Sequence, residues 1–551
     1  MCTAEARPKT VSDIFERLSR HLALDGGVRN SREFAELNRN SERVQFARAL
    51  LERFDLMPRC EVGAKSRKMA DELREAGNRL FKFKSNALAL EKYTQSVAYA
   101  PKDSEQLALA FANRSAVLYE LKLYQECLRD ITQAFSSNYP QHLHHKLLKR
   151  RENAEAAKSA QCEVNYHESV PTLSSTPNPD IECASSCIRI SFEENQGRHV
   201  VAVNDIEIGD VVAIEEPFTK ILLRDHYLTH CYNCLKPSPN LIPCDNCVLA
   251  LYCDEGCRRL ASDTFHKYEC PILATLLDLN VNKFGLLALK ICILAEFKQG
   301  SGDEATRYKS GNYREIHNLI TNAHLRDLSD LFHKAAMAAV IYELFEKNTQ
   351  FFNDGSAERR DIFKDLLLLH LQTGPSNFHE ISQINNERDG VSELEEIGAG
   401  AYAFLSLLNH SCNPNVIRYC YGSSIVLRAL RPIAKGEQLF DNYGYHYAVM
   451  QREERRRRLT NQYFFHCECE TCENNWPLYQ ELPIRGTKIS ITVEQIKALA
   501  DGSIEVANSV MDYLKKTAET LEGTRPCKEL ADVQEILKQC YAIFGNRRQT
   551  F

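Results

Sequence analysis

The stretch CYNCLKPSPNLIPCDNCVLALYCDEGCRRLASDTFHKYEC, residues 231–270, contains seven cysteines and one histidine. These side chains form four close pairs with two or three residues between the members: Cys231/Cys234, Cys244/Cys247, Cys253/Cys257 and His266/Cys270. A pair at that spacing can reach one tetrahedral zinc ion from a tight turn, and two pairs fill its four positions. The stretch therefore predicts a module that folds around two structural zinc ions.

The bulk composition indicates an intracellular protein of several domains. The chain has 551 residues, which suggests about three or four domains. Its net charge of -6 argues against a generally basic nucleic-acid binder. No apolar run reaches the roughly 18–20 residues of a membrane span, and the N-terminus has no apolar signal core. We therefore expect a monomer in the cytoplasm and nucleus, away from membranes, whose cysteine clusters bind metal rather than form disulfides.

The first 158 residues are predicted to be helical. Residues 1–67 form a short N-terminal helical segment, and residues 68–158 contain a repeat in which Gly77-Asn78 is echoed by Ala112-Asn113. The offset of about 35 residues is close to the tetratricopeptide period. Basic and amide side chains on these helices resemble the carboxylate clamp of chaperone-binding tetratricopeptide domains, which holds the acidic tail of a heat-shock chaperone; a solvated basic face is the alternative. The residues concerned are Arg74, Asn78, Asn113, Lys146 and Arg150.

The remaining chain alternates between strand-like and helical patterns. A Ser-, Pro- and Asn-rich linker is expected at 159–186, followed by alternating strands at 187–230, the zinc module at 231–270 and a helical insert at 271–375. Short strands and turns are expected at 376–450, a cysteine-containing segment at 451–483 and C-terminal helices at 484–551.

The zinc module resembles a MYND finger. Interleaved pairing would place Cys231, Cys234, Cys253 and Cys257 on one zinc, and Cys244, Cys247, His266 and Cys270 on the other. Another pairing of the ligands remains open. Closed four-ligand sites leave no position for a reacting water, so they are expected to fold the module. The resemblance implies a surface for protein partners such as deacetylase corepressors, and a purely structural brace is the alternative.

Three downstream motifs occur together: NHSCNPN at 409–415, GEQLFDNYG at 436–444 and CxCxxC at 467–472. They resemble the SET and post-SET segments of protein-lysine methyltransferases. With the finger and the repeats, the layout resembles the tetratricopeptide-bearing branch of the SET-and-MYND-domain family. This implies an α+β multidomain fold, with a β-rich SET fold split by the finger and a helical insert. It also implies methyl transfer from S-adenosylmethionine to lysines of histone or non-histone proteins, in a role such as transcriptional regulation.

The resemblance also implies site residues. Tyr443 is the expected catalytic tyrosine, because aligning a neutral amine with the methyl donor is chiefly a positioning problem. A third zinc would be held by Cys412, Cys467, Cys469 and Cys472. Cofactor contacts are expected from Gly197, Arg198, His199, Asn377, Asn409, His410, Tyr463 and Phe465. The family usually has a second glycine where this chain has His199. The alternatives are that Tyr443, Tyr463 and Phe465 are core aromatics and that Asn409-His410 is a turn that orders Cys412.

Other functions remain to be weighed. A non-enzymatic adaptor that recruits corepressors or chaperones is the main alternative, and a DNA-binding factor is disfavoured by the acidic balance. The basic run Arg452–Arg458, REERRRR, could contact nucleic acid or an acidic partner, but a solvated helix face is favoured. The C-terminal region is short for the family, so the substrate cleft would be open or covered by the repeats.

Overall fold

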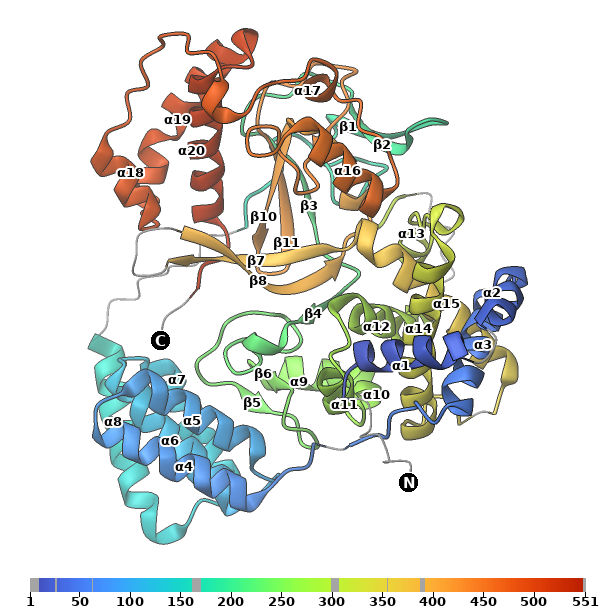
Figure 1. Cartoon of the computed structure of the whole chain (residues 1–551). Helices are drawn as coiled ribbons and strands as arrows, with labels where there is room; N and C mark the ends of the chain where they lie inside the picture. The colour runs from blue at the N-terminus through green and yellow to red at the C-terminus, as the bar shows by residue number, and fades with distance from the viewer. Residues whose placement is uncertain are drawn as a thin grey trace.

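The computed structural model describes residues 9–24, 27–61, 63–160, 170–298, 307–353, 355–386 and 392–548. Figure 1 shows a helical array, a central β-rich region with its helical insert, and a separate group of C-terminal helices. Within these ranges, no helix combines the length and the apolar character needed to cross a bilayer.

The N-terminal segment covers the helical insert. Its helices are α1 (Val11–Leu24), α2 (Gly27–Glu36) and α3 (Asn40–Arg53). Helix α3 packs against α14 (Leu328–Asn348) and α15 (Ala357–Asn377). The Arg48 guanidinium of α3 forms ion pairs with Glu343 at 2.6 Å and Glu346 at 2.9 Å, both on α14. Chain segments about 300 residues apart thus form one helical layer.

The array consists of antiparallel helices, and the repeated Gly-Asn pattern serves its packing. The helices are α4 (Arg67–Lys82), α5 (Asn86–Tyr99), α6 (Glu105–Glu120), α7 (Tyr124–Ser136) and α8 (His144–Ala160). A Cβ at Gly77 would lie only 2.6 Å from the Tyr93 ring, so glycine permits the approach of α4 to α5. The Asn78 Oδ1 accepts hydrogen bonds from Tyr93 and Asn113, both at 2.8 Å. This network joins the first helices of the two repeats.

The array is docked on the zinc module through a buried cation. Arg114 of α6 is fully buried, and its guanidinium donates to Asp130 of α7 at 2.7 and 2.9 Å. The same guanidinium donates to the carbonyl of Leu241, at 2.9 Å, in the zinc module. A more exposed pair, Lys102 with Asp245 at 2.8 Å, lies beside it.

The central β region contains five small sheets. Two antiparallel sheets have two strands each: β1 (Ile188–Glu193) with β2 (Gly197–Ala202), and β5 (Ile242–Pro243) with β6 (Leu251–Tyr252). A three-stranded antiparallel sheet has the order β10 (Val416–Tyr421), β11 (Ser424–Ala429) and β3 (Val211–Glu215). A second has the order β4 (Thr219–Leu222), β8 (Ser392–Ala401) and β7 (His379–Asn386). The fifth, β9 (Asn409–His410) with β12 (Phe440–Asp441), is parallel. The zinc module and the insert lie between β4 and β7 in the sequence. The insert includes α12 (Lys283–Lys298) and α13 (Tyr313–His317).

Residues 170–186, the described part of the expected linker, are packed on the sheet rather than loose. Ala184 and Ser185 are fully buried, and Ala184 bridges Ala213 of β3. The Asn178 side chain accepts from the backbone N–H of Asp180 at 2.8 Å and donates to the carbonyl of Ile188 at 2.6 Å. Polar composition predicted a linker or surface loop; most residues from 170 to 180 are exposed, whereas Asn178 satisfies the backbone groups of a turn that leads into the buried Ala184 and Ser185.

The C-terminal helices have their own core against the β10–β11–β3 sheet. They are α18 (Val493–Ala500), α19 (Ile504–Leu521) and α20 (Lys528–Phe544). After α20, the chain pairs with β7, where the Ile384 N–H donates to the Asn546 carbonyl and the Arg548 N–H donates to the Ile384 carbonyl, both at 2.8 Å. The C-terminal helices, and not the array, therefore lie along this face of the SET region (Figure 1).

Replacing Arg114 by methionine should lower the free energy of unfolding of the array by about 3–5 kcal/mol, because the buried Asp130 loses its counter-charge. Denaturant midpoints and protease cleavage within α4–α8 measure the effect. The control Lys102→Met removes an exposed pair and should cost about 0–1 kcal/mol. Equal, small effects of both changes would contradict the role given to Arg114.

Candidate functional site

Three clusters of cysteine and histidine have the geometry of metal sites. In each cluster the four candidate ligand atoms lie within 4.8 Å of one another. Sulfur–sulfur distances of 3.6–3.9 Å match the edge of a tetrahedron with zinc–sulfur bonds of about 2.3 Å. Each cluster could therefore hold a zinc ion. The sets are Cys231, Cys234, Cys253 and Cys257; Cys244, Cys247, His266 and Cys270; and Cys412, Cys467, Cys469 and Cys472. These are the groups that interleaved pairing predicts for the finger and that the family resemblance implies downstream.

The basic run at 452–458 supports the third cluster. It lies on α16 (Arg452–Tyr463), where Arg455 is fully buried. The Arg455 guanidinium donates to the sulfur of Cys412 at 3.1 Å and to that of Cys472 at 3.4 Å. The outer arginines of the run pair with Glu453 or Glu454. The run is thus neither a free basic patch nor a fully solvated face, because its central residue stabilises sulfur ligands in their charged form.

The two SET motifs meet at the short parallel pair β9–β12. There, Asn409 lies opposite Phe440 and His410 opposite Asp441. Tyr443, two residues after β12, donates its backbone N–H to His410 Nδ1 at 3.1 Å. Its phenol donates to the carbonyl of Leu408 at 2.7 Å. The expected catalytic tyrosine and the expected cofactor turn are therefore in direct contact.

Aromatic rings surround the phenol of Tyr443. The Tyr463 ring lies 4.6 Å from it, and Phe465 lies 6.4 Å away and nearly perpendicular. Phe465 also contacts His410, with ring centroids 6.1 Å apart. Burial raises the pKa of Tyr443 well above its usual value, with a smaller effect from Tyr463. The phenol consequently stays protonated and acts as a hydrogen-bonding group.

The loop before β2 approaches the same turn. Gly197 has φ of +68°, and a Cβ there would meet open space. The Asn409 side chain donates to the Gln196 carbonyl at 3.3 Å. Arg198 points toward the insert and donates to the Asn318 carbonyl at 2.8 Å. His199, which replaces the usual glycine, is buried, and its Nδ1 lies 3.0 Å from the Gly197 carbonyl, so the ring turns back on its own loop.

Asn377 joins the insert to the segment before β9 and lines neither of the two cavities described below. It ends α15, and its side-chain amide donates to the carbonyls of Ile320 and Thr373, both at 2.8 Å. Its own carbonyl accepts from the hydroxyl of Ser406, at 2.7 Å, in η4 (Leu405–Leu407). The helical insert is thereby held against the segment that leads into β9.

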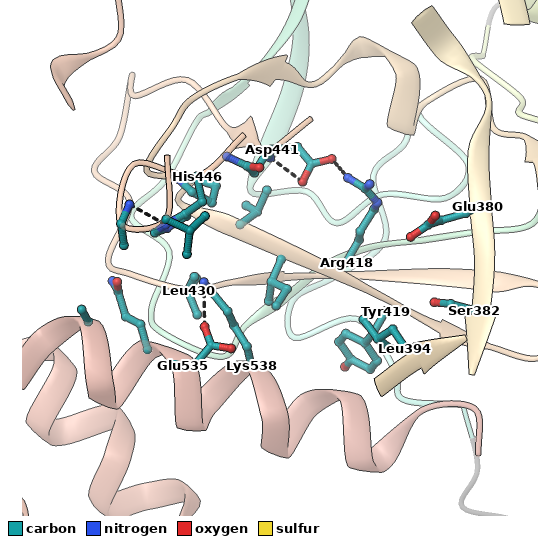
Figure 2. A pocket seen from close by; sticks show the side chains of 18 of the residues that line it. Glu380, Ser382, Leu394, Arg418, Tyr419, Leu430, Asp441, His446, Glu535 and Lys538 are labelled. Carbon is teal, nitrogen blue, oxygen red and sulfur yellow. Dashed lines mark hydrogen bonds and ion pairs between the residues drawn. The ribbon is translucent and has the colours of Figure 1, made fainter. Parts of the chain in front are cut away.

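Tyr443 lines one of two adjoining cavities. The smaller, the Tyr443 cavity, has a volume of about 240 Å³ and includes Tyr463 as its only lining residue from the expected cofactor set. Its lining residues are Lys283, Phe284, Pro375, Ser376, Phe378, His379, Glu380, Leu405, Ser406, Leu408, Arg418, Tyr443, Gly444, Gln462 and Tyr463. The larger, the α20 cavity, has about 550 Å³ and lies between β7, β10 and α20 (Figure 2). Glu380 and Arg418 line both cavities.

A buried carboxylate fixes the segment that carries these groups. Glu215, at the end of β3, accepts hydrogen bonds from the backbone N–H groups of Phe404 and Leu405, both at 2.7 Å. Burial raises its pKa to about 7, although these donors and the Ser310 hydroxyl lower it. Glu215 therefore holds the start of η4, and with it the Leu408 carbonyl that orients Tyr443.

A family profile for the SET domain matches residues 197–444, from the Gly197 loop to the residue after Tyr443. Protein-lysine N-methyltransferase SMYD4 of Danio rerio is 28% identical over 505 residues, which cover 75% of this chain and 66% of that protein. The human SMYD4 is 24% identical over 537 residues, covering 73% and 66% respectively. N-lysine methyltransferase SMYD2 of Bos taurus is 27% identical over 350 residues, covering 63% and 70%. Residues 197–444 thus match the SET domain, and the chain as a whole is similar to SMYD proteins.

The chain spans 66% of the length of the SMYD4 proteins that it matches. Among solved structures, the SET domain of LSMT bound to lysine and AdoHcy is 11% identical, with a TM-score of 0.25, and the match covers 66% of this chain and 86% of that one. That likeness is too weak to support an argument about the site.

Several residues of this site have no recognisable signal in the sequence. Glu215 is identified only by backbone partners that lie 189 and 190 residues further along the chain. Arg455 looks like one of several surface arginines. On the array, the clamp-like residues already have partners, since Arg150 donates to the Ala112 carbonyl at 2.7 Å and Arg74 to Asp71 at 3.0 Å. Lys146 is exposed.

Glu215→Gln provides a pH test of the buried carboxylate. The folded-state pKa is about 7, above the ordinary 4.5, so the favourable contribution of the protonated group is complete below pH 4.5 and is lost as pH rises through 7. The stability advantage of the wild type over the variant should therefore shrink by roughly 3 kcal/mol between pH 4.5 and 7.5.

Denaturant unfolding at several pH values measures this difference. The neighbouring exposed side chain Glu216, changed to glutamine, is the matched control and should alter stability by less than about 1 kcal/mol. A difference between wild type and Glu215→Gln that does not vary with pH would exclude the proposed titration.

Proposed function

We propose that the chain is an S-adenosylmethionine-dependent protein-lysine N-methyltransferase. The observation that carries the proposal is the Tyr443 phenol, held by the Leu408 carbonyl at the wall of a cavity and beside the Asn409-His410 turn. The names of the SMYD relatives, which describe lysine methyltransferases, support the same activity.

The residues around β9 suit the proposed cofactor. S-adenosylmethionine would supply an electrophilic methyl group together with an adenine ring and an amino-acid group to be recognised. Open space at Gly197 permits close approach to the loop backbone, and the Asn409 amide can hydrogen-bond to a polar group. Phe465 and Tyr463 offer aromatic faces next to His410 and Tyr443. The donor set therefore fits the cofactor.

The Tyr443 cavity suits a lysine side chain. A free lysine amine has a pKa near 10.4, and a partly dry cavity favours its neutral, nucleophilic form. The protonated Tyr443 phenol can hold the amine by hydrogen bonding, and the Leu408 carbonyl fixes the direction of that phenol. The chain's task is then to align the amine with the methyl donor and to exclude water.

We further propose that three zinc ions brace the structure, two in the MYND-like module and one at Cys412. All twelve ligands are cysteine or histidine, which suit zinc, and each set of four closes its site. The buried positive charge of Arg455 beside Cys412 and Cys472 supports the thiolate form that zinc requires.

The proposed partners are histone or non-histone proteins that present a lysine. Corepressor binding at the finger, chaperone tails at the array and residence in the cytoplasm and nucleus stay predictions. The contacts that the array makes with the finger and within itself limit the predictions of corepressor and chaperone binding. Arg114 and Lys102 already bind one side of the finger, and most of the clamp-like side chains hydrogen-bond within the array.

Tyr443→Phe should lower kcat for methyl transfer by about 100-fold or more while leaving cofactor affinity nearly unchanged, because it removes one positioning hydroxyl from the cavity. Transfer of labelled methyl groups to protein substrates and calorimetry with S-adenosylmethionine give the two readouts. Tyr445→Phe is the control, since that hydroxyl donates to the exposed Gln462 at 2.8 Å. Wild-type protein that neither binds the cofactor nor transfers methyl groups would favour the non-enzymatic adaptor.

Metal analysis tests the zinc proposal. The wild type should contain three zinc ions per chain, and Cys412→Ser should retain two, because three remaining thiols bind the ion more weakly. Inductively coupled plasma mass spectrometry measures the content. Cys60→Ser, outside the clusters, should leave three. Unchanged zinc in Cys412→Ser would remove that residue from the ligand set.

A further inference from the structure

The α20 cavity adjoins the Tyr443 cavity, because the two share lining residues. Glu380 of β7 and Arg418 of β10 line both, so a peptide whose lysine enters the Tyr443 cavity passes these two side chains. Figure 2 shows Glu380 and Arg418 on neighbouring strands above α20. This continuity makes the lining of the α20 cavity relevant to the choice of substrate.

The charges in the α20 cavity are unevenly matched. Its four carboxylates are Glu380, Asp441, Asp532 and Glu535, and its two cations are Arg418 and Lys538. Arg418 pairs with Asp441, and Lys538 pairs with Glu535 at 3.4 Å. His446 adds no positive charge, since burial lowers its pKa to about 3. The lining is therefore acidic by two charges.

Glu380 is the carboxylate available to a ligand. Its side chain is exposed, and within the described residues it has no hydrogen-bonding or ionic partner. Asp532, by contrast, accepts the Tyr479 hydroxyl at 2.5 Å. Burial raises the pKa of Tyr463 to about 12, and the nearby charge of Glu380 contributes to the rise. A free carboxylate thus stands at the junction of the two cavities.

The same cavity has apolar walls that are open to solvent. Leu394 of β8 is 65% exposed and Val449 is 77% exposed, and both line it. An occupant that combined a basic side chain with apolar ones would complement both features.

We propose that the α20 cavity binds the segment flanking the target lysine, and that Glu380 selects substrates with an arginine or lysine one or two positions from that lysine. The inference rests on the proposed function and specifies its substrate class. An extended peptide advances about 3.3 Å per residue, so a long basic side chain at those positions can reach a carboxylate at the cavity mouth. Electrostatic attraction at such a rim acts on binding more than on the chemical step.

Lysine peptides that differ only in Arg, Gln or Glu at the neighbouring positions provide the test. The wild type should prefer the Arg peptide to the Gln peptide by about three- to tenfold in kcat/KM at low salt, through KM. Glu380→Gln should remove most of this preference, and Glu380→Lys should reverse it toward the Glu peptide. Higher salt should weaken the preference. Glu519→Gln, an exposed carboxylate on α19 outside the cavity, should leave it intact.

Fluorescence polarisation of the same peptides separates the two proposals. Glu380-dependent binding without methyl transfer would overturn the proposed function and support the docking surface. Methyl transfer with the same peptide ranking in the wild type and Glu380→Lys would overturn the inference alone. Failure of every peptide to bind would also overturn the inference, whatever happens with whole proteins.

Discussion

Cys412 is the point at which the two halves of the site are joined. It follows β9 directly, and its sulfur lies 3.9 Å from Cys467 and 3.6 Å from Cys472, which are 55 and 60 residues further along the chain. A tetrahedral metal site allows its donors almost no freedom of position. The end of α16 and the segment that follows it to Cys467 therefore lie beside β9, where Tyr463 contacts Tyr443 and Phe465 contacts His410.

The charges at this junction are consistent with a bound cation. Four thiolates around one Zn²⁺ leave a net charge of about -2, which is costly to bury without compensation. Arg455 supplies a positive charge from a fully buried position, with its guanidinium against two of the sulfurs. Neutral thiols would give this buried guanidinium much weaker partners. The arginine and a bound zinc ion would thus favour the same ionisation state of the cluster.

The sequence predicted features that depend on local spacing. The finger ligands, the Gly77-Asn78 repeat and the motifs around Asn409 and Tyr443 can be recognised because each occupies a short stretch. Features that depend on distant contacts could not be found. Nothing local distinguishes Glu215 from other glutamates, because its partners are the backbone N–H groups of Phe404 and Leu405. The cavity that Glu380 shares with α20 forms only because α20 folds back over β10. The composition of 170–186 likewise gave no sign that Ile181, Ala184 and Ser185 are buried, since Ala184 bridges Ala213 of β3.

The docking of the array also changes how the finger can act. The Arg114 guanidinium holds the Leu241 carbonyl directly before β5, and Asn240 donates to the Glu126 carbonyl at 3.4 Å. A ligand that bound this side of the finger would have to displace the array and expose a buried ion pair, which is strongly unfavourable. Helix α9 (Glu255–Thr264) begins beside the array, because its Arg258 shares Asp245 with Lys102, but Leu260 on the same helix is 56% exposed. The array thus covers the side of the finger that carries Asn240 and Leu241.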